Sequence, residues 1–179
     1  MGWPDVEMRE LISRDRLQAR ISELGAQITE DYRGRELVLI CVLKGSFLFT
    51  ADLSRRIELP IEIDFLGVSS YGDSTSSSGV VQITSDLTHP IGGKEVLLVE
   101  DIVDTGLTMT YLLENLQTRR PNSVRICTLL YKNIEKNHHL TIDYCGFEIP
   151  PEFVVGYGLD YMQKYRNLDY IGVLTNPTP

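Results

Sequence analysis

The sequence predicts an α/β fold in which a mainly parallel, twisted sheet is flanked by helices. Two aliphatic runs, residues 37–43 and 96–99, are apolar throughout, which is typical of strands buried on both faces of a parallel sheet. Strand and helix patterns alternate along the chain, which implies right-handed βαβ units. The length of 179 residues suits one compact domain. We therefore expect one domain over residues 1–179, with a small accessory lobe built from the two ends of the chain.

The first predicted helix follows a short apolar entry at Leu11 and Ile12, and Ser13 is placed as its cap. Apolar residues then recur at spacings of three and four, which gives the helix one buried face: Leu17, Ile21, Leu24 and Ile28. Gly34 closes this helical region.

A predicted strand at residues 37–43 is broken by Lys44, Gly45 and Ser46, and Ser46 is expected to cap a second helix that runs towards Arg56. Residues 61–68 alternate between apolar and polar side chains, which predicts a strand.

Residues 69–79 are polar and rich in Ser and Gly, which predicts a loop, and a short strand is expected at residues 80–83. Turn signals at residues 89–90 and 92–93 lead into the strand that contains residues 96–99. The remaining predicted elements are a helix over 107–118 and strands at 124–130, 154–155 and 171–174.

The composition excludes several classes of protein. A formal net charge of −8 argues against nucleic acid as a main partner, because binding there depends on Lys and Arg. Cys41, Cys127 and Cys145 are odd in number and lack CxxC spacing, so we expect neither a disulfide framework nor a structural zinc site. We see no signal peptide and no apolar run long enough for a membrane span, and we expect a reduced, cytoplasmic compartment.

Three acids follow the aliphatic run 96–99, namely Glu100, Asp101 and Asp104. Acids at the carboxyl end of such a strand lie at the edge where open α/β sheets bind ligands. The next residues open a helical pattern and offer N–H groups and hydroxyls to an anion: Thr105, Gly106, Leu107 and Thr108. Carboxylates beside a phosphate loop predict a sugar-phosphate site. The alternative is a solvated acidic turn before an ordinary helix that Asp104 or Thr105 caps.

The segment from Glu100 to Thr108 resembles the phosphoribosyl-diphosphate signature of the purine and pyrimidine phosphoribosyltransferases, most closely that of their hypoxanthine-guanine branch. The resemblance implies the type I phosphoribosyltransferase fold. It also implies that Glu100 and Asp101 bind the ribose hydroxyls near a Mg²⁺ ion, and that residues 104–108 wrap the 5′-phosphate. Asp104 would be the general base for the purine N7. Some members carry a basic residue at the position of Leu107.

Two further segments resemble the diphosphate side of this family. Lys44 and Gly45 match its diphosphate loop, in which a cis peptide precedes the Lys, and Arg166 would approach the diphosphate. Ser70 and Tyr71 match the start of its mobile lid. An ordinary turn and a plain flexible loop are the alternatives.

The purine side of the family resembles residues 132–161 of this chain in order and spacing. By this resemblance Lys132 donates to the purine O6, Phe153 stacks on the ring, and Val154 reads the ring edge through its backbone. Asp160 would bind a second Mg²⁺. Without the surrounding pattern, Phe153 is more often a core residue and Lys132 a solvated one.

The resemblance therefore implies an enzyme of purine salvage. It would transfer the 5-phosphoribosyl group from phosphoribosyl diphosphate to hypoxanthine or guanine, giving IMP or GMP and diphosphate, with Mg²⁺ and as a homodimer or homotetramer. One alternative is a relative that prefers xanthine or guanine. Another is a regulator that keeps the fold and binds nucleic acid, but the presence of Asp104 and the acidic composition argue against it.

Overall fold

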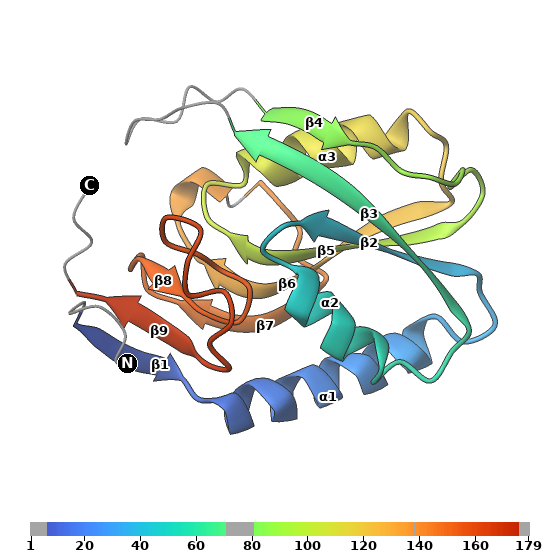
Figure 1. Cartoon of the computed structure of the whole chain (residues 1–179). Coiled ribbons are helices and arrows are strands. Elements are labelled where there is room, and N and C mark those ends of the chain that lie inside the picture. The colour runs from blue at the N-terminus through green and yellow to red at the C-terminus, as the bar shows by residue number, and fades with distance from the viewer. Residues whose placement is uncertain (1–6, 71–80, 138, 176–179) are drawn as a thin grey trace.

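The computed structural model describes residues 7–70, 81–137 and 139–175 and has the predicted α/β architecture (Figure 1). Its helices are α1 (Arg14–Asp31), α2 (Phe47–Ser54) and α3 (Leu107–Gln117), with a short 3₁₀ turn, η1 (Glu135–Asn137). Its strands are β1 (Met8–Ile12), β2 (Leu37–Leu43), β3 (Ile61–Ser70), β4 (Val81–Ser85), β5 (Glu95–Val103), β6 (Ser123–Lys132), β7 (Tyr144–Ile149), β8 (Val154–Val155) and β9 (Ile171–Leu174).

The main sheet has six strands in the order β4-β3-β2-β5-β6-β7. All neighbours pair in parallel except β3 and β4, which are antiparallel at one edge. The aliphatic strands β2 and β5 lie side by side in the middle, where both faces are covered. The mainly parallel sheet predicted from the sequence is thereby confirmed.

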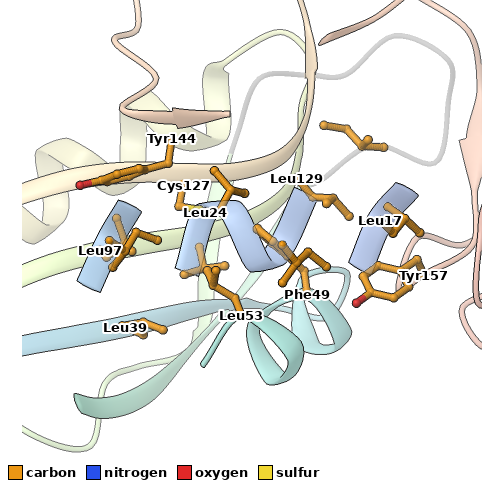
Figure 2. Packing of buried hydrophobic residues seen from close by; sticks show 14 of the residues in the cluster. Leu17, Leu24, Leu39, Phe49, Leu53, Leu97, Cys127, Leu129, Tyr144 and Tyr157 are labelled. Atoms are coloured by element: carbon orange, nitrogen blue, oxygen red, sulfur yellow. The ribbon is translucent and has the colours of Figure 1, made fainter. Parts of the chain in front are cut away.

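Helices α1 and α2 cover one face of the sheet, and α3 lies on the opposite face (Figure 1). On the first face, the apolar stripe of α1 packs against strand residues such as Leu39, Leu97 and Leu129 (Figure 2). Burial of each such aliphatic side chain contributes about 1.5–3 kcal/mol before the loss of conformational entropy is counted. Ser13 caps α1 as expected, because its Oγ accepts a hydrogen bond from the N–H of Arg16 at 3.4 Å.

The opposite face has its own core, in which Met109, Leu112 and Leu116 of α3 pack against the other side of β2 and β5. Since α3 begins directly after β5, this packing fixes the helix N-terminus at the carboxyl edge of the sheet.

The accessory lobe is a separate three-stranded antiparallel sheet with the order β1-β9-β8. It joins the two ends of the chain, since Met8 pairs with Leu174 (Figure 1). The lobe was expected, but β1 was predicted only as an apolar entry. Strand β7 was not identified as a strand.

One local prediction is wrong. Ser46 occupies the position before α2, but its side chain makes no capping hydrogen bond. Its Oγ donates a hydrogen bond to the carbonyl oxygen of Val42 at 2.7 Å. The hydroxyl therefore stabilises the turn after β2 and does not cap α2. In the described part of the chain, no helix has the length and apolar character needed to cross a membrane.

Gly25 lies where α1 touches the end of α2. A Cβ atom added to Gly25 would lie 2.4 Å from Cβ of Arg56 and 2.7 Å from its carbonyl oxygen. We therefore expect Gly25→Ala to lower the free energy of unfolding by about 1–3 kcal/mol, the usual cost of overpacking. Helix propensity alone would raise the free energy of unfolding by about 1 kcal/mol, so the sign of the measured change shows which effect dominates. Urea unfolding measures the effect, and Gln27→Ala on the exposed face is the control, with a change within about 0.5 kcal/mol.

Candidate active site

Two adjoining hollows lie at the carboxyl edge of the main sheet. One has a volume of about 240 Å³ and is lined by residues from the ends of β2 and β5 and from the start of α3. The other, of about 250 Å³, is lined by residues that include Lys132, Phe153 and Asp160. Asp101, Ile102 and Asp104 line both. The predicted sugar-phosphate and purine residues therefore meet at one edge, as expected for a parallel sheet.

Glu100 and Asp101 lie within the last residues of β5. Glu100 is buried, and its Oε1 accepts a hydrogen bond from the N–H of Asp101 at 3.1 Å. Burial, together with the nearby carboxylate of Asp101, raises the pKa of Glu100 well above its ordinary value. Burial also raises the pKa of Asp101, while the charge of Arg166 acts in the opposite direction. A solvated acidic turn, the alternative for this segment, is thus excluded.

The loop after β2 is packed closely against the carboxylate of Asp101. A Cβ atom added to Gly45 would lie 1.6 Å from Oδ2 of Asp101. The peptide bond between Leu43 and Lys44 is cis, as the resemblance implied. Leu43 and Gly45 both line the first hollow.

Gly106 is the residue before α3 and has φ +80°, so neither Asp104 nor Thr105 occupies the capping position. The alternative in which one of them caps the helix is therefore wrong. Thr105, Gly106 and Thr108 line the first hollow, whereas Leu107 is an exposed residue. A positive φ at Gly costs little and turns the backbone so that the helix N-terminus faces the hollow.

In the second hollow, Nζ of Lys132 lies 2.7 Å from Oδ2 of Asp104. The Lys132 side chain is only 12% exposed and that of Asp104 is 51% exposed, so Lys132 is not a solvated residue. Phe153 is 45% exposed and is not a core residue. Its ring meets Tyr161 edge to face, with centroids 5.8 Å apart. Val154 is buried beside it.

Asp160 and Arg166 form an ion pair in which a guanidinium nitrogen lies 2.7 Å from Oδ1. The other carboxylate oxygen of Asp160 accepts a hydrogen bond from the N–H of Gln163 at 2.9 Å. Arg166 also donates to the carbonyl oxygen of Gly158 at 2.7 Å. Its two contacts therefore link both Gly158 and Asp160 to Arg166 within one segment.

The acids fit a magnesium ion that is shared with a ligand. Within residues 7–70, 81–137 and 139–175, no three His, Cys, Asp or Glu side chains are grouped as a complete metal site. Mg²⁺ is commonly held by one or two carboxylates, with water and substrate oxygens as its other ligands. Glu100 and Asp101 supply such hard oxygens, and a cation beside them would favour their ionised forms.

Ser70 is the last residue of β3, and its backbone pairs with Val81 of β4. Tyr71, the second residue of the predicted lid, lies outside the described residues.

Sequence reasoning missed two positions. Tyr157 has φ +48°, and its hydroxyl donates a hydrogen bond to the carboxylate of Asp52 in α2. Burial raises the pKa of Asp52, but hydrogen bonds from Tyr157, Gln18 and Arg55 outweigh it, so that the pKa lies below its ordinary value. The other position is Asn137, a polar residue of η1 that is fully buried. A lone Tyr or Asn in a loop carries no sequence signal of such a contact.

Comparisons with known proteins agree with this geometry. The family model of the phosphoribosyl transferase domain matches residues 12–162. The chain is 54% identical over 170 residues to the hypoxanthine-guanine phosphoribosyltransferase of Mycobacterium tuberculosis, covering 92% of this chain and 84% of that protein. It is 48% identical over 170 residues to that of Bacillus subtilis, covering 95% and 94%.

Two solved structures are similar along nearly their whole length. The hypoxanthine phosphoribosyltransferase of Staphylococcus aureus has a TM-score of 0.89 at 48% identity, covering 95% of this chain and 92% of that chain. The enzyme of Trypanosoma cruzi, in complex with the product IMP, has a TM-score of 0.87 at 43% identity, covering 97% of each chain.

Gly158 offers a test of the close approach between the site's loops. Its φ is +105°, and an added Cβ atom would lie 1.9 Å from the carbonyl oxygen of Gly45. Gly158→Ala should lower the free energy of unfolding by more than about 2 kcal/mol, because backbone strain and a steric clash act together. Gly93 has φ +75° and nothing within 4 Å of such a Cβ, so Gly93→Ala measures strain alone, about 1 kcal/mol. Equal losses for the two variants in urea unfolding would contradict the close approach.

Proposed function

The chain belongs to the phosphoribosyltransferase family, and we propose that it transfers the 5-phosphoribosyl group of phosphoribosyl diphosphate to hypoxanthine or guanine. The products are IMP or GMP and diphosphate, and the reaction is one of purine salvage. One observation carries the proposal: Asp101 and Asp104 line both the hollow that holds the phosphate loop and the hollow that contains Lys132 and Phe153. A sugar phosphate and a base bound in the two hollows would meet at these residues.

On the sugar side, backbone N–H groups and hydroxyls of Thr105, Gly106 and Thr108 bind the 5′-phosphate, assisted by the N-terminus of α3. Leu107 adds only its backbone to this loop. Ionised Glu100 and Asp101 accept hydrogen bonds from the ribose hydroxyls. Their charge also lies near C1, where positive charge develops as the bond to diphosphate breaks.

On the diphosphate side, Lys44 and Gly45 bind the leaving group, with Arg166 near it, and Ser70 and Tyr71 begin a lid that excludes water. Mg²⁺, held by Glu100 and Asp101, would neutralise charge on the diphosphate as it leaves. Asp160 is the proposed ligand of a second ion. Its two oxygens are engaged by Arg166 and Gln163, so this ion would replace at least one of those contacts.

On the purine side, Lys132 donates to O6 and Asp104 accepts the proton from N7 while N9 forms the bond to C1. The 2.7 Å contact between Lys132 and Asp104 supports this pairing, because O6 and N7 are neighbours on one edge of the base. Lys carries only donors, so it favours a 6-oxo group over the 6-amino group of adenine. The exposed ring of Phe153 stacks on the base, and the backbone of Val154 reads its edge.

The proposal is tested by nucleotide formation from phosphoribosyl diphosphate and Mg²⁺ with hypoxanthine, guanine, xanthine and adenine in parallel, each repeated with a chelator. We expect product from hypoxanthine or guanine, at most trace product from adenine, and none after chelation. Xanthine as the best substrate would correct the base that is preferred. Tight binding of phosphoribosyl diphosphate without product from any base would overturn the proposal in favour of a sensor.

Asp104→Asn tests the general base. The amide keeps the size of the side chain and a contact with Lys132 but does not accept the N7 proton. We expect kcat to fall by about 10²–10⁴-fold, as for the loss of a general base. The KM for phosphoribosyl diphosphate should change by less than about threefold. Asp86→Asn, at an exposed ion pair with Arg119, is the control and should leave kcat unaltered. An unchanged kcat in Asp104→Asn would remove this role.

We also propose that the chain forms a homodimer or homotetramer. Phe47, Ile63 and Phe65 are exposed and line one apolar hollow between α2 and β3. Such a patch is typical of an interface. Phe65→Glu should reduce the mass measured by light scattering to that of one chain, 20.3 kDa, whereas Met162→Glu, an exposed control outside the patch, should not. A wild-type protein with the mass of one chain would contradict the proposal.

A cytoplasmic location is supported by three free cysteines, since thiols persist in reducing compartments. Fractionation of cells that express the protein tests this placement, and recovery outside the cytoplasmic fraction would contradict it.

A further inference from the structure

We propose that Asn137 is a positioning residue that sets the distance between Asp104 and Lys132, and so controls how the purine is held. The inference rests on the proposed function, because it assigns Asn137 a role in that same site. Asn137 itself does not line either hollow.

Asn137 is fully buried in η1, and both ends of its side chain are hydrogen-bonded. Its Nδ2 donates to the carbonyl oxygen of Asp104 at 2.5 Å and to that of Lys132 at 2.6 Å. Its Oδ1 accepts a hydrogen bond from the hydroxyl of Tyr131 at 2.9 Å. The two carbonyl oxygens can only accept, so the nitrogen of the amide must face them.

The two carbonyl groups lie where the ladder between β5 and β6 ends, so no backbone hydrogen bond of that ladder fixes the distance between them. Strands β5 and β6 pair in parallel up to Val103 and Tyr131. Asp104 and Lys132 are the next residues on the two strands, at the point where the ladder ends. The side-chain amide of Asn137 therefore bridges the two backbones one position beyond the last pair. It holds together the residues whose side chains form the proposed reader of O6 and N7.

Asn137 also lies beneath the phosphate loop. A Cβ atom added to Gly106 would lie 3.1 Å from Cβ of Asn137. An alanine at position 137 keeps the Cβ atom that lies beneath Gly106 and loses only the amide. Asn137→Ala thus separates the bridge from the support of the phosphate loop.

We expect Asn137→Ala to lower kcat/KM for hypoxanthine by about 10- to 100-fold, because small errors of position are costly in a catalytic site. The KM for phosphoribosyl diphosphate should change by less than about threefold. The ratio of kcat/KM for hypoxanthine to that for adenine should fall. A merely structural role would lower the melting temperature without altering the balance between the two substrates.

Asn137→Asp separates the hydrogen bonds from the shape of the side chain. The carboxylate has nearly the same volume but presents oxygen to both carbonyls, so we expect a loss at least as large as that of Asn137→Ala. Near-normal activity of Asn137→Asp would show that packing alone matters and would overturn the inference.

Two further variants complete the design. Tyr131→Phe removes only the hydroxyl that orients Oδ1, and should lower kcat/KM for hypoxanthine by about two- to fivefold, the equivalent of one modest hydrogen bond. It keeps the inference testable should the variants at position 137 fail to fold. Asn122→Ala is the matched control, because Asn122 donates to Glu95 at the opposite edge of the sheet. Its kinetic constants should equal those of the wild type.

The outcomes separate the two proposals. If the wild type forms no nucleotide from any base, the proposed function fails. If the wild type is active and Asn137→Ala and Tyr131→Phe leave the hypoxanthine constants unchanged, or lower those for both substrates equally, the proposed function stands and the role of Asn137 is overturned.

Discussion

Three segments of the chain meet at Gly45 without room for one more carbon atom, and the rest of the site depends on this close packing. The carboxylate of Asp101 lies against one side of Gly45, and the backbone of Gly158 lies against its carbonyl oxygen. The first contact fixes the loop after β2 to the acids of β5. The second fixes the segment that carries Asp160 to the same loop. Residues far apart in the sequence therefore hold one arrangement through close packing around the backbone of Gly45.

The two hollows differ in how their residues are held. On the sugar side, the acids belong to a central strand and the phosphate loop to a helix that packs on the core, so rigid elements carry them. On the purine side, Asp104 follows the last residue of β5, Lys132 is the last residue of β6, and Phe153 is half exposed. Under the proposed function, the ion pair between Asp104 and Lys132 opens or rearranges when a base enters. The carboxylate of Asp104 is half exposed, so water can solvate it when the pair opens.

The sequence was sufficient where local pattern and tertiary environment agree. Helix α1 and strands β2 and β5 were predicted because their apolar periodicity matches their burial. The acids and the loop before α3 lie together in the first hollow, as expected, because they follow one another along the chain at the carboxyl edge of the sheet. Strand β1 was not predicted as a strand because it is half exposed and depends on pairing with β9, at the far end of the chain. The cap assigned to Ser46 failed because its hydroxyl prefers a carbonyl of the preceding strand. The contacts of Asn137 and Tyr157 exist only after folding.

The small sheet gives the protein a particular order of assembly. Val154 belongs to β8, which pairs with β9, and β9 in turn pairs with β1. A chain that is still being synthesised has the acids, the phosphate loop and Lys132 well before residues 171–174 emerge from the ribosome. The residues of the sugar side are thus available for packing before the last strand is made. The purine side waits for the last strand, and the first strand waits with it as an unpaired edge that a nascent chain must keep from aggregating.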